Sequence, residues 1–355
     1  MSVSLFLFSF LMYFPIVQNL DNGLARKPPM GWMSWGYYMC GVDCKNNTDK
    51  CLDENLIISV ADKFYRDGYQ EAGFEYIIID DCWSQKKRDT LGRLVPDKDR
   101  FPRGIKFIAD YIHERGLKFG MYTNIADVTC MGYPGSRGHF QSDAKMFAEW
   151  GVDYLKVDGC FVAEKYLNTA YIKLGMHLNA TGRPMVYSCS WPYYIEFIHH
   201  KKLIFGTNSL TDSQRRVHIA VYAMLASPLL LSCDMDNITP YERELLQNLD
   251  LMAIAQDPLG IMGRPYQLQH LITLWVKPHL PRKGDTYHSI SFALVNLDEI
   301  DRSISFTPGQ YGLNSTDYTV MDVFTKTFLR NITVQDTITI NVPPEDVILY
   351  TLFPL

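Results

Sequence analysis

Polar and aromatic residues stand at the carboxyl ends of several short apolar runs in this 355-residue chain. They are Trp35, Asp80 and Asp81, Tyr122 and Asn124, Lys156 and Asp158, and Ser190 and Trp191. Carboxylates and a lysine make charge-assisted hydrogen bonds to hydroxyl groups, and an aromatic face stacks on the apolar face of a pyranose. A carboxylate can also attack an anomeric carbon as a nucleophile. These residue types therefore favour chemistry on a sugar.

A metal-dependent hydrolase is the other way to use such a polar cluster, and the histidines argue against it. Metal hydrolases of the barrel type usually carry His-x-His on a strand. Here the histidines are scattered, and the adjacent pair His199 and His200 is expected in a solvated loop. A zinc site on Cys40, Cys44 and Cys51 lacks a C-x2-C pair. We therefore expect no metal and no cofactor.

Short apolar runs alternate with longer stretches of helical periodicity over residues 21–262. The runs are residues 30–35, 76–81, 118–124, 153–159, 184–191 and 227–235. Helical spacing is clear over residues 53–72 and 143–150, and residues 211–214 have the form of a capping box that opens a helix reaching Ala226. This alternation predicts an α/β fold of the TIM-type (β/α)8 barrel class. In such a barrel the carboxyl ends of the strands line the active site, so the polar residues above should meet at its mouth.

The number of strands is too small for a closed barrel. We count six apolar runs before the pattern changes, or seven if residues 202–205 are included, whereas a barrel of this kind needs about eight. After residue 262 the pattern becomes one of alternation and turns, as in residues 288–297 and 336–342. We therefore predict an incomplete barrel domain over residues 21–262 and an antiparallel β-sandwich domain over residues 263–355.

The composition is that of a globular protein of the secretory pathway. A net charge of −5 without blocks of like charge gives no electrostatic footprint for nucleic acid or an anionic membrane. Residues 1–20 are interpreted as a signal peptide, because their apolar run over residues 5–17 is too short to span a bilayer. The alternative is a buried N-terminal helix.

The cysteines and glycosylation motifs agree with that compartment. The chain has 8 cysteines, which in a secreted protein are expected in disulfides. N-x-S/T motifs lie at Asn46, Asn179, Asn237, Asn314 and Asn331.

Seven motifs carry a resemblance to a known family. In chain order from about residue 21 to 264 they are DNGLARKPPMGWMSW, YIIIDDCW, GRLVPDKDRFPRGI, CMGYPGS, FAEWGVDYLKVDGC, GRPMVYSCSWP and IAQDPLGIMGR. With them the chain resembles the retaining α-galactosidases and α-N-acetylgalactosaminidases, glycoside hydrolase family 27. The resemblance implies a lysosomal or secreted homodimer that acts on terminal α-linked galactose or N-acetylgalactosamine of glycolipids or glycoproteins.

The same resemblance implies roles for individual residues. Asp158 would be the nucleophile, which forms a covalent glycosyl-enzyme. The sugar would be bound by Trp35, Asp80, Asp81, Tyr122, Lys156, Ser190 and Tyr193. The implied disulfides are Cys40 with Cys82, Cys44 with Cys51, and Cys130 with Cys160.

Two of these positions bear on which sugar is preferred. Ser190 stands where the family selects its sugar, since a small residue leaves room for a 2-acetamido group and a glutamate contacts a 2-hydroxyl. Ser190 therefore favours N-acetylgalactosamine. Tyr193, at the second selecting position, is large where the acetamido-type enzymes are small, and it argues the other way.

The chain departs from the family at the second catalytic carboxylate. A retaining glycosidase needs an acid/base carboxylate about 5 to 5.5 Å from the nucleophile. Relative to the family, roughly fifty to sixty residues with barrel strands 6 and 7 and the acid/base aspartate are absent after residue 194. Cys189 and Cys233 are left without their expected partners, and Asp212, a carboxylate that remains further along the chain, is expected to cap a helix.

Three interpretations remain open. The chain is a shortened isoform or incomplete gene model of a glycosidase, a sugar-binding protein without turnover, or a chain that fails to close its barrel and is retained by quality control. The first describes the family function best. For this chain we expect very low catalytic activity, because one carboxylate of such a pair does not replace the other.

Overall fold

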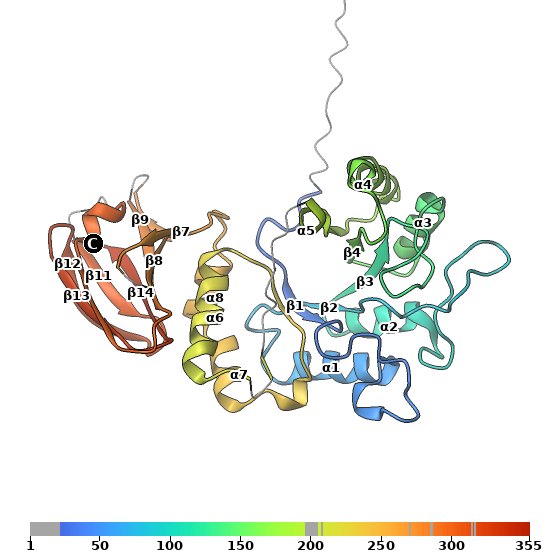
Figure 1. Ribbon diagram of the computed structural model, residues 1–355, viewed down its shortest axis with the longest axis horizontal. Helices are drawn as coiled ribbons and strands as arrows, with labels where there is room; N and C mark the ends of the chain where they lie inside the picture. The colour runs from blue at the N-terminus through green and yellow to red at the C-terminus, as the bar shows by residue number, and fades with distance from the viewer. Residues whose placement is uncertain are drawn as a thin grey trace, which may run out of the picture.

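The computed structural model describes residues 22–195, 205–206, 209–269, 271–284, 287–313, 315 and 317–355. The predicted signal peptide over residues 1–20 lies outside the described residues, as do His199, His200, Asn314 and most of the run 202–205. A parallel sheet with its helices forms the first part of the chain, and antiparallel sheets form the second (Figure 1). None of the helices in the described part is long and apolar enough to cross a membrane.

The parallel sheet contains the six predicted strands. They are β1 Met30–Met33, β2 Tyr76–Ile78, β3 Lys118–Asn124, β4 Tyr154–Asp158, β5 Val186–Cys189 and β6 Leu229–Leu231. The helices are α1 Glu54–Arg66, α2 Gly104–His113, α3 Phe140–Glu149, α4 Glu164–Asn179, α5 Trp191–Ile195, α6 Asp212–Met224, α7 Pro240–Leu246 and α8 Leu249–Ala255. The predicted capping box is present, with Thr211 as the N-cap of α6 and Gln214 as its partner.

The barrel is open on one side. The strand order is β5-β4-β3-β2-β1-β6, so that β6 pairs with β1 in parallel, as the last strand of a barrel would. Within the described residues β5 and β6 are the two edges, with no strand between them. The prediction of an incomplete barrel is therefore confirmed, and the missing strands belong between α5 and α6.

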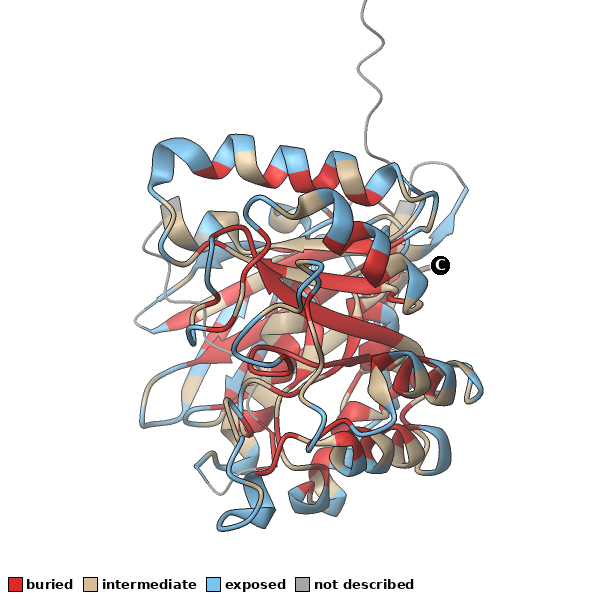
Figure 2. Cartoon of the chain, turned by 90° about the vertical axis from the view of Figure 1, so that its right-hand side faces the viewer, coloured by how far each residue is buried: buried red, intermediate tan, exposed pale blue. Residues whose placement is uncertain are grey.

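Side-chain alternation along the strands sends the polar residues to the inside of the sheet. In β4, Leu155 and Val157 are fully buried in the layer between sheet and helices. Tyr154 lies instead in a small inner cluster with Tyr76 and Val186. Because side chains of a strand alternate between faces, Lys156 and Asp158 follow Tyr154 on the inner face, towards the mouth. Figure 2 shows how burial concentrates in the strands, while the outer faces of the helices are exposed.

The C-terminal part is a sandwich of two antiparallel sheets, as predicted. The larger sheet has the order β12-β11-β14-β9-β8-β7, and the smaller pairs β10 with β13. The strands are β7 Arg264–Gln267, β8 Ile272–Lys283, β9 Tyr287–Asn296, β10 Arg302–Phe306, β11 Asp317–Asp322, β12 Thr327–Thr333, β13 Ile338–Val342 and β14 Val347–Pro354. One apolar cluster between the two sheets includes Phe292 and Phe306. The domain boundary at residues 262 and 263 stays a prediction.

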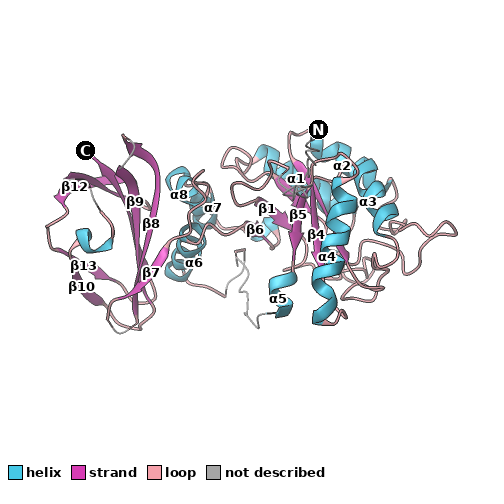
Figure 3. Cartoon of the chain, turned by 90° about the horizontal axis from the view of Figure 1, so that it is seen from above, coloured by secondary structure: helices cyan, strands magenta, loops and turns pink. Residues whose placement is uncertain are grey.

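Helices α6 and α8 lie between the parallel sheet and the sandwich (Figure 3). Arg216 on α6 forms an ion pair with Asp346, directly before β14. Lys277 of β8 is 1% exposed, and its ammonium donates to the backbone oxygens of Ala223 at 2.9 Å and Ile254 at 2.5 Å. Since these carbonyls belong to the last turns of α6 and α8, one buried cation binds two helix C-termini across the contact.

The burial of Lys277 predicts a pH-dependent stability difference. Burial lowers the pKa of this lysine to about 8, and the charge of Asp257 offsets only part of the effect. From about pH 8 to about pH 10 the unfolded chain then holds more protons than the folded one, so this lysine makes stability rise with pH. In urea titrations the wild type should therefore gain stability relative to Lys277→Met over this range. A stability difference that stays constant with pH would refute this assignment.

Candidate active site

A cavity of ≈ 670 Å³ opens at the carboxyl ends of the parallel strands. Its lining residues are Trp35, Asp80, Tyr122, Cys130, Lys156, Asp158, Cys160, Cys189, Ser190, Pro192 and Tyr194. They come from β3, β4, β5 and α5 and from the loops after β1, β2, β3, β4 and β5. The cavity thus brings together most of the residues that the sequence analysis placed at strand ends.

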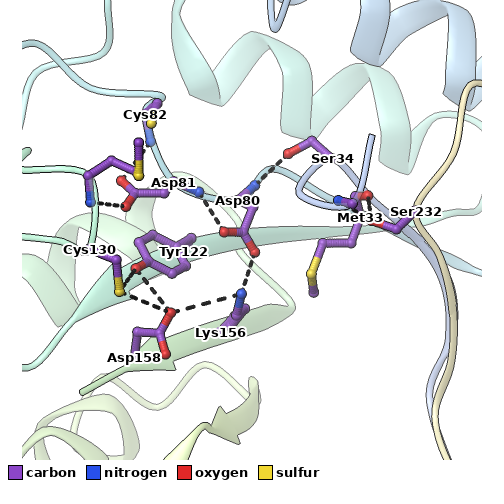
Figure 4. Close-up of polar contacts among 12 residues, drawn as sticks. Met33, Ser34, Asp80, Asp81, Cys82, Tyr122, Cys130, Lys156, Asp158 and Ser232 are labelled. Carbon is purple, nitrogen blue, oxygen red and sulfur yellow. Dashed lines mark hydrogen bonds and ion pairs between the residues drawn. The ribbon is translucent and has the colours of Figure 1, made fainter. Parts of the chain in front are cut away.

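Lys156 and two carboxylates form the charged centre of the cavity (Figure 4). The Lys156 ammonium is 2.7 Å from Asp80 Oδ2 and 4.0 Å from Asp158 Oδ2. Burial by itself would lower the pKa of Lys156, but the charges of Asp80 and Asp158 outweigh it, and the net pKa is raised. The lysine therefore stays cationic and holds the two aspartates at one place.

Both oxygens of Asp158 accept a hydrogen bond from a tyrosine. Tyr122 OH donates to Oδ2 at 3.1 Å, and Tyr194 OH donates to Oδ1 at 2.7 Å. Burial and the charge of Asp158 raise the pKa of Tyr122, so this phenol keeps its proton. The carboxylate is oriented from two sides, as an attacking group requires. A substrate atom that approaches Oδ1 would have to displace the hydroxyl of Tyr194.

Asp80 and Asp81 are both 1% exposed, but their carboxylates have different partners. Asp80 faces the cavity, whereas Asp81 accepts hydrogen bonds from the backbone N–H groups of Cys82 at 2.7 Å and Met131 at 3.0 Å. Burial raises the pKa of Asp81, and its hydrogen bonds to Thr129 and the backbone act in the opposite direction. Asp81 thus fastens the loop after β3 to the end of β2 and does not line the cavity.

Three disulfides join the same cysteines that the resemblance pairs. They are Cys40–Cys82, Cys44–Cys51 and Cys130–Cys160. Cys130 Sγ lies 3.5 Å from Asp158 Oδ2. Cys130, Asp158 and Cys160 could be mistaken for a metal cluster, since their ligand atoms lie within 4.8 Å of one another. Because the two sulfurs are bonded to each other, they are not available as thiolate ligands.

The remaining predicted positions differ in what they contact. Trp35 and Ser190 line the cavity, whereas the side chain of Tyr193 on α5 lies outside the described part of the structure. Trp191 stacks on Tyr171 with ring centroids 6.0 Å apart. Asn124 is fully buried, and its amide donates to backbone oxygens of the loops after β3 and β4, so it positions loops and does not line the cavity.

Tyr194 is a site residue that the sequence analysis missed. It lies three residues beyond the predicted strand end, on the short helix α5, and no spacing in the sequence relates it to β4. The only signal was its place beside the sugar-selecting position 193. Its contact with Asp158 depends on how α5 turns back over the mouth.

A second catalytic carboxylate is not found among the described residues that line the cavity. The only carboxylates there are Asp158 and Asp80, and Asp80 is engaged by Lys156. Asp212 begins α6, is mostly exposed and pairs with Arg215 at 3.0 Å. Cys189, which also lines the cavity, and Cys233 are free thiols.

Comparison with known proteins gives concordant matches. The sequence profile of the family Melibiase_2, described as alpha galactosidase A, matches residues 27–203 and 197–257. The chain is 35% identical to the alpha-N-acetylgalactosaminidase of Gallus gallus, covering 94% of this chain and 95% of that protein. It is 35% identical to human alpha-galactosidase A, covering 82% and 79%. The crystal structure of alpha-galactosidase I from Mortierella vinacea superposes with a TM-score of 0.82, at 27% identity over 94% of this chain and 98% of that one.

The comparisons also locate an internal gap. The alignment with the Gallus gallus protein is 395 positions long, whereas 94% of the 355 residues of this chain is about 334, so about 60 positions lack a residue of this chain. The two ranges matched by the family profile overlap over residues 197–203. This is the interval between α5 and α6, where the sheet is open.

Proposed function

The chain belongs to the alpha-galactosidase family, glycoside hydrolase family 27, and on this premise we propose that it binds a terminal α-linked galactose or N-acetylgalactosamine but hydrolyses it very slowly. The observation that carries this proposal is the arrangement of Asp80, Lys156 and Asp158 at one cavity, with Lys156 in contact with both carboxylates. Such a cluster makes charge-assisted hydrogen bonds to sugar hydroxyls.

In this proposal each group has one task. Asp80 and Lys156 bind hydroxyl groups of the sugar, and Trp35 and Tyr122 supply aromatic surface against its ring. Asp158 is the nucleophile that would attack the anomeric carbon. Asp81 acts on the sugar only indirectly, by fixing the loop that carries Met131.

Slow hydrolysis follows from the missing acid. The glycosidic oxygen leaves as an alkoxide unless a carboxylic acid protonates it, and the same group must later activate water. Asp80 is unsuited to this role because its Oδ2 is already engaged by the Lys156 ammonium at 2.7 Å. General acid–base catalysis contributes about 10² to 10⁴ in rate, and we expect a deficit of that size relative to complete family members.

Binding and turnover test the proposal separately. Isothermal titration with methyl α-galactoside and methyl α-N-acetylgalactosaminide should detect binding of at least one, and we expect the second to bind more tightly because Ser190 is small. Asp80→Asn should weaken binding about 10- to 100-fold, since a charged hydrogen-bond partner of both the sugar and Lys156 is lost. The matched control is Asp99→Asn, a change at an exposed aspartate that does not line the cavity.

The outcomes discriminate between the possible functions. Binding that disappears in Asp80→Asn but not in Asp99→Asn, with slow turnover of aryl glycosides, supports the proposal. Turnover at the rate of complete relatives would overturn the argument from the missing acid. Absence of binding to both sugars would leave the third interpretation, a chain that does not form a working cavity.

The wider biological setting is part of the same proposal. The ligands would be the termini of α-galactosyl or α-N-acetylgalactosaminyl glycans on glycolipids or glycoproteins. The disulfides require an oxidising compartment, which fits the secretory pathway and a lysosomal or extracellular destination. A homodimer is proposed on the resemblance alone.

A further inference from the structure

The N-x-S/T motif at Asn331 lies on a strand, unlike the other described motifs. Asn331, Ile332 and Thr333 form the end of β12, while Asn46, Asn179 and Asn237 lie in loops or at helix termini. N-linked glycosylation takes place in the oxidising secretory compartment, where disulfides also form, and this chain has three disulfides. A chain that folds in this compartment therefore encounters the enzyme that glycosylates such motifs.

Strand β12 is an edge of the six-stranded sheet. It pairs with β11 on one side, and no strand pairs with its other side within the described residues. An edge strand offers unpaired backbone groups to any other strand, and proteins protect such edges with charges, bulges or covering groups. A bulge near Val320 and Met321 interrupts this pair, but the pairing beyond it, up to Thr333, is regular.

The same edge carries two exposed apolar side chains. Phe328 is 68% exposed and Leu329 is 49% exposed. Asn331 pairs with Thr319, and Phe328 pairs with Met321. Because Thr319 and Met321 are two residues apart in β11 and so share a face, Asn331 and Phe328 stand on one face of β12. An apolar edge of this kind is a site of association between copies of a chain.

We propose that Asn331 carries an N-linked glycan and that this glycan prevents the β12 edge of one copy from pairing with that of a second copy. Asn331 is exposed, and its side-chain oxygen accepts a hydrogen bond from the Thr319 hydroxyl at 2.9 Å, on the face that also carries Phe328. A hydrated oligosaccharide attached there occupies the space that an incoming strand would need. The glycan thereby covers the β12 edge, which the fold leaves unpaired within the described residues. Its effect is independent of the sugar cavity.

Occupancy is tested on the full chain secreted from a eukaryotic cell. Peptide mass spectrometry after enzymatic glycan removal in heavy-oxygen water should show Asn331 converted to a labelled aspartate. Thr333→Ala should abolish this label, and Thr333→Ser should retain it, because serine preserves the motif. An unlabelled Asn331 in the wild type would overturn the proposal.

The protective role is tested by sedimentation velocity on the same proteins. Asn331→Gln and Thr333→Ala should both increase the fraction of large species several-fold, whereas Thr333→Ser should not. Asn179→Gln, which removes a motif at the end of α4, is the matched control and should behave as the wild type. Adding Phe328→Lys to Asn331→Gln should restore the wild-type distribution. If the glycan is present but its removal leaves association unchanged, the protective role is refuted.

Discussion

Insertion of the absent segment is expected to raise the turnover of aryl α-galactosides and aryl α-N-acetylgalactosaminides by about 10² to 10⁴-fold. The segment is the one that the Gallus gallus relative carries in the gap of about 60 positions, and it would be placed between Ile195 and Phe205. The physical reason is that Asp158 is oriented by Tyr122 and Tyr194, whereas the only other carboxylate among the described residues that line the cavity is Asp80, which Lys156 engages. The measurement is kcat/KM on both substrates.

Two variants of the restored protein separate chemistry from folding. In one, the acid/base aspartate of the inserted segment is replaced by asparagine, which still closes the barrel but supplies no acid. In the other, Asp158→Asn removes the nucleophile. Both should lose the gain in turnover. The variant of the inserted aspartate should nevertheless keep a gain in the free energy of unfolding, because β5 and β6 are no longer open edges. A gain in turnover that survives without the inserted aspartate would show that closure of the barrel, and not the acid, was limiting.

The strands and their polar ends could be predicted because both depend on local pattern. Apolar runs of strand length gave all six strands of the parallel sheet, and the rule that strand ends line a barrel mouth brought Asp80, Lys156 and Asp158 to one cavity. The sequence pattern does not encode which strands pair. The resemblance supplied this information by placing the absent strands after residue 194, and the sheet order agrees with it, since β6 joins β1 and the opening lies beside β5.

Neighbouring residues of similar type were harder to separate. Asp80 and Asp81 are adjacent residues after the end of β2, and only Asp80 lines the cavity. Once the strand has ended, the alternation of side chains no longer tells from the sequence which of two adjacent residues faces the cavity. The sequence analysis therefore predicted both as sugar ligands, and the contacts of the Asp81 carboxylate with the backbone N–H groups of Cys82 and Met131 are the reason for proposing an indirect role for it.

Residues that act through distant contacts left no readable signal. Tyr194 reaches Asp158 from α5, 36 residues further along the chain. Lys277 would be expected at the surface by its type, yet it is buried because two helix C-termini, formed by residues 23 and 54 positions away in sequence, supply its partners. Such contacts depend on the assembled tertiary structure, which hydropathy along one strand does not describe.

Glu242→Ala is expected to lower the free energy of unfolding by about 3 to 5 kcal/mol, because the buried Arg215 guanidinium loses its buried partner and keeps an ion pair with the exposed Asp212. Glu242 on α7 is fully buried and accepts from the Arg215 guanidinium at 2.8 Å. It also accepts from the backbone N–H of Gly206 at 3.0 Å. The Glu242 carboxylate on α7 thus connects the segment before α6, through Gly206, with Arg215 on α6.

The comparison that isolates this effect uses the same helix. Glu244→Ala removes an exposed carboxylate two residues further along α7 and should change the free energy of unfolding by no more than about 0.5 kcal/mol. Glu242→Gln keeps acceptor capacity for Gly206 but removes the charge opposite Arg215, so its effect should fall between the two alanine variants. Urea titrations followed by tryptophan fluorescence measure all three. If Glu242→Ala and Glu244→Ala destabilise equally, the return of the chain past the open edges is held by apolar contacts such as those of Phe205, and the buried ion pair is not its anchor.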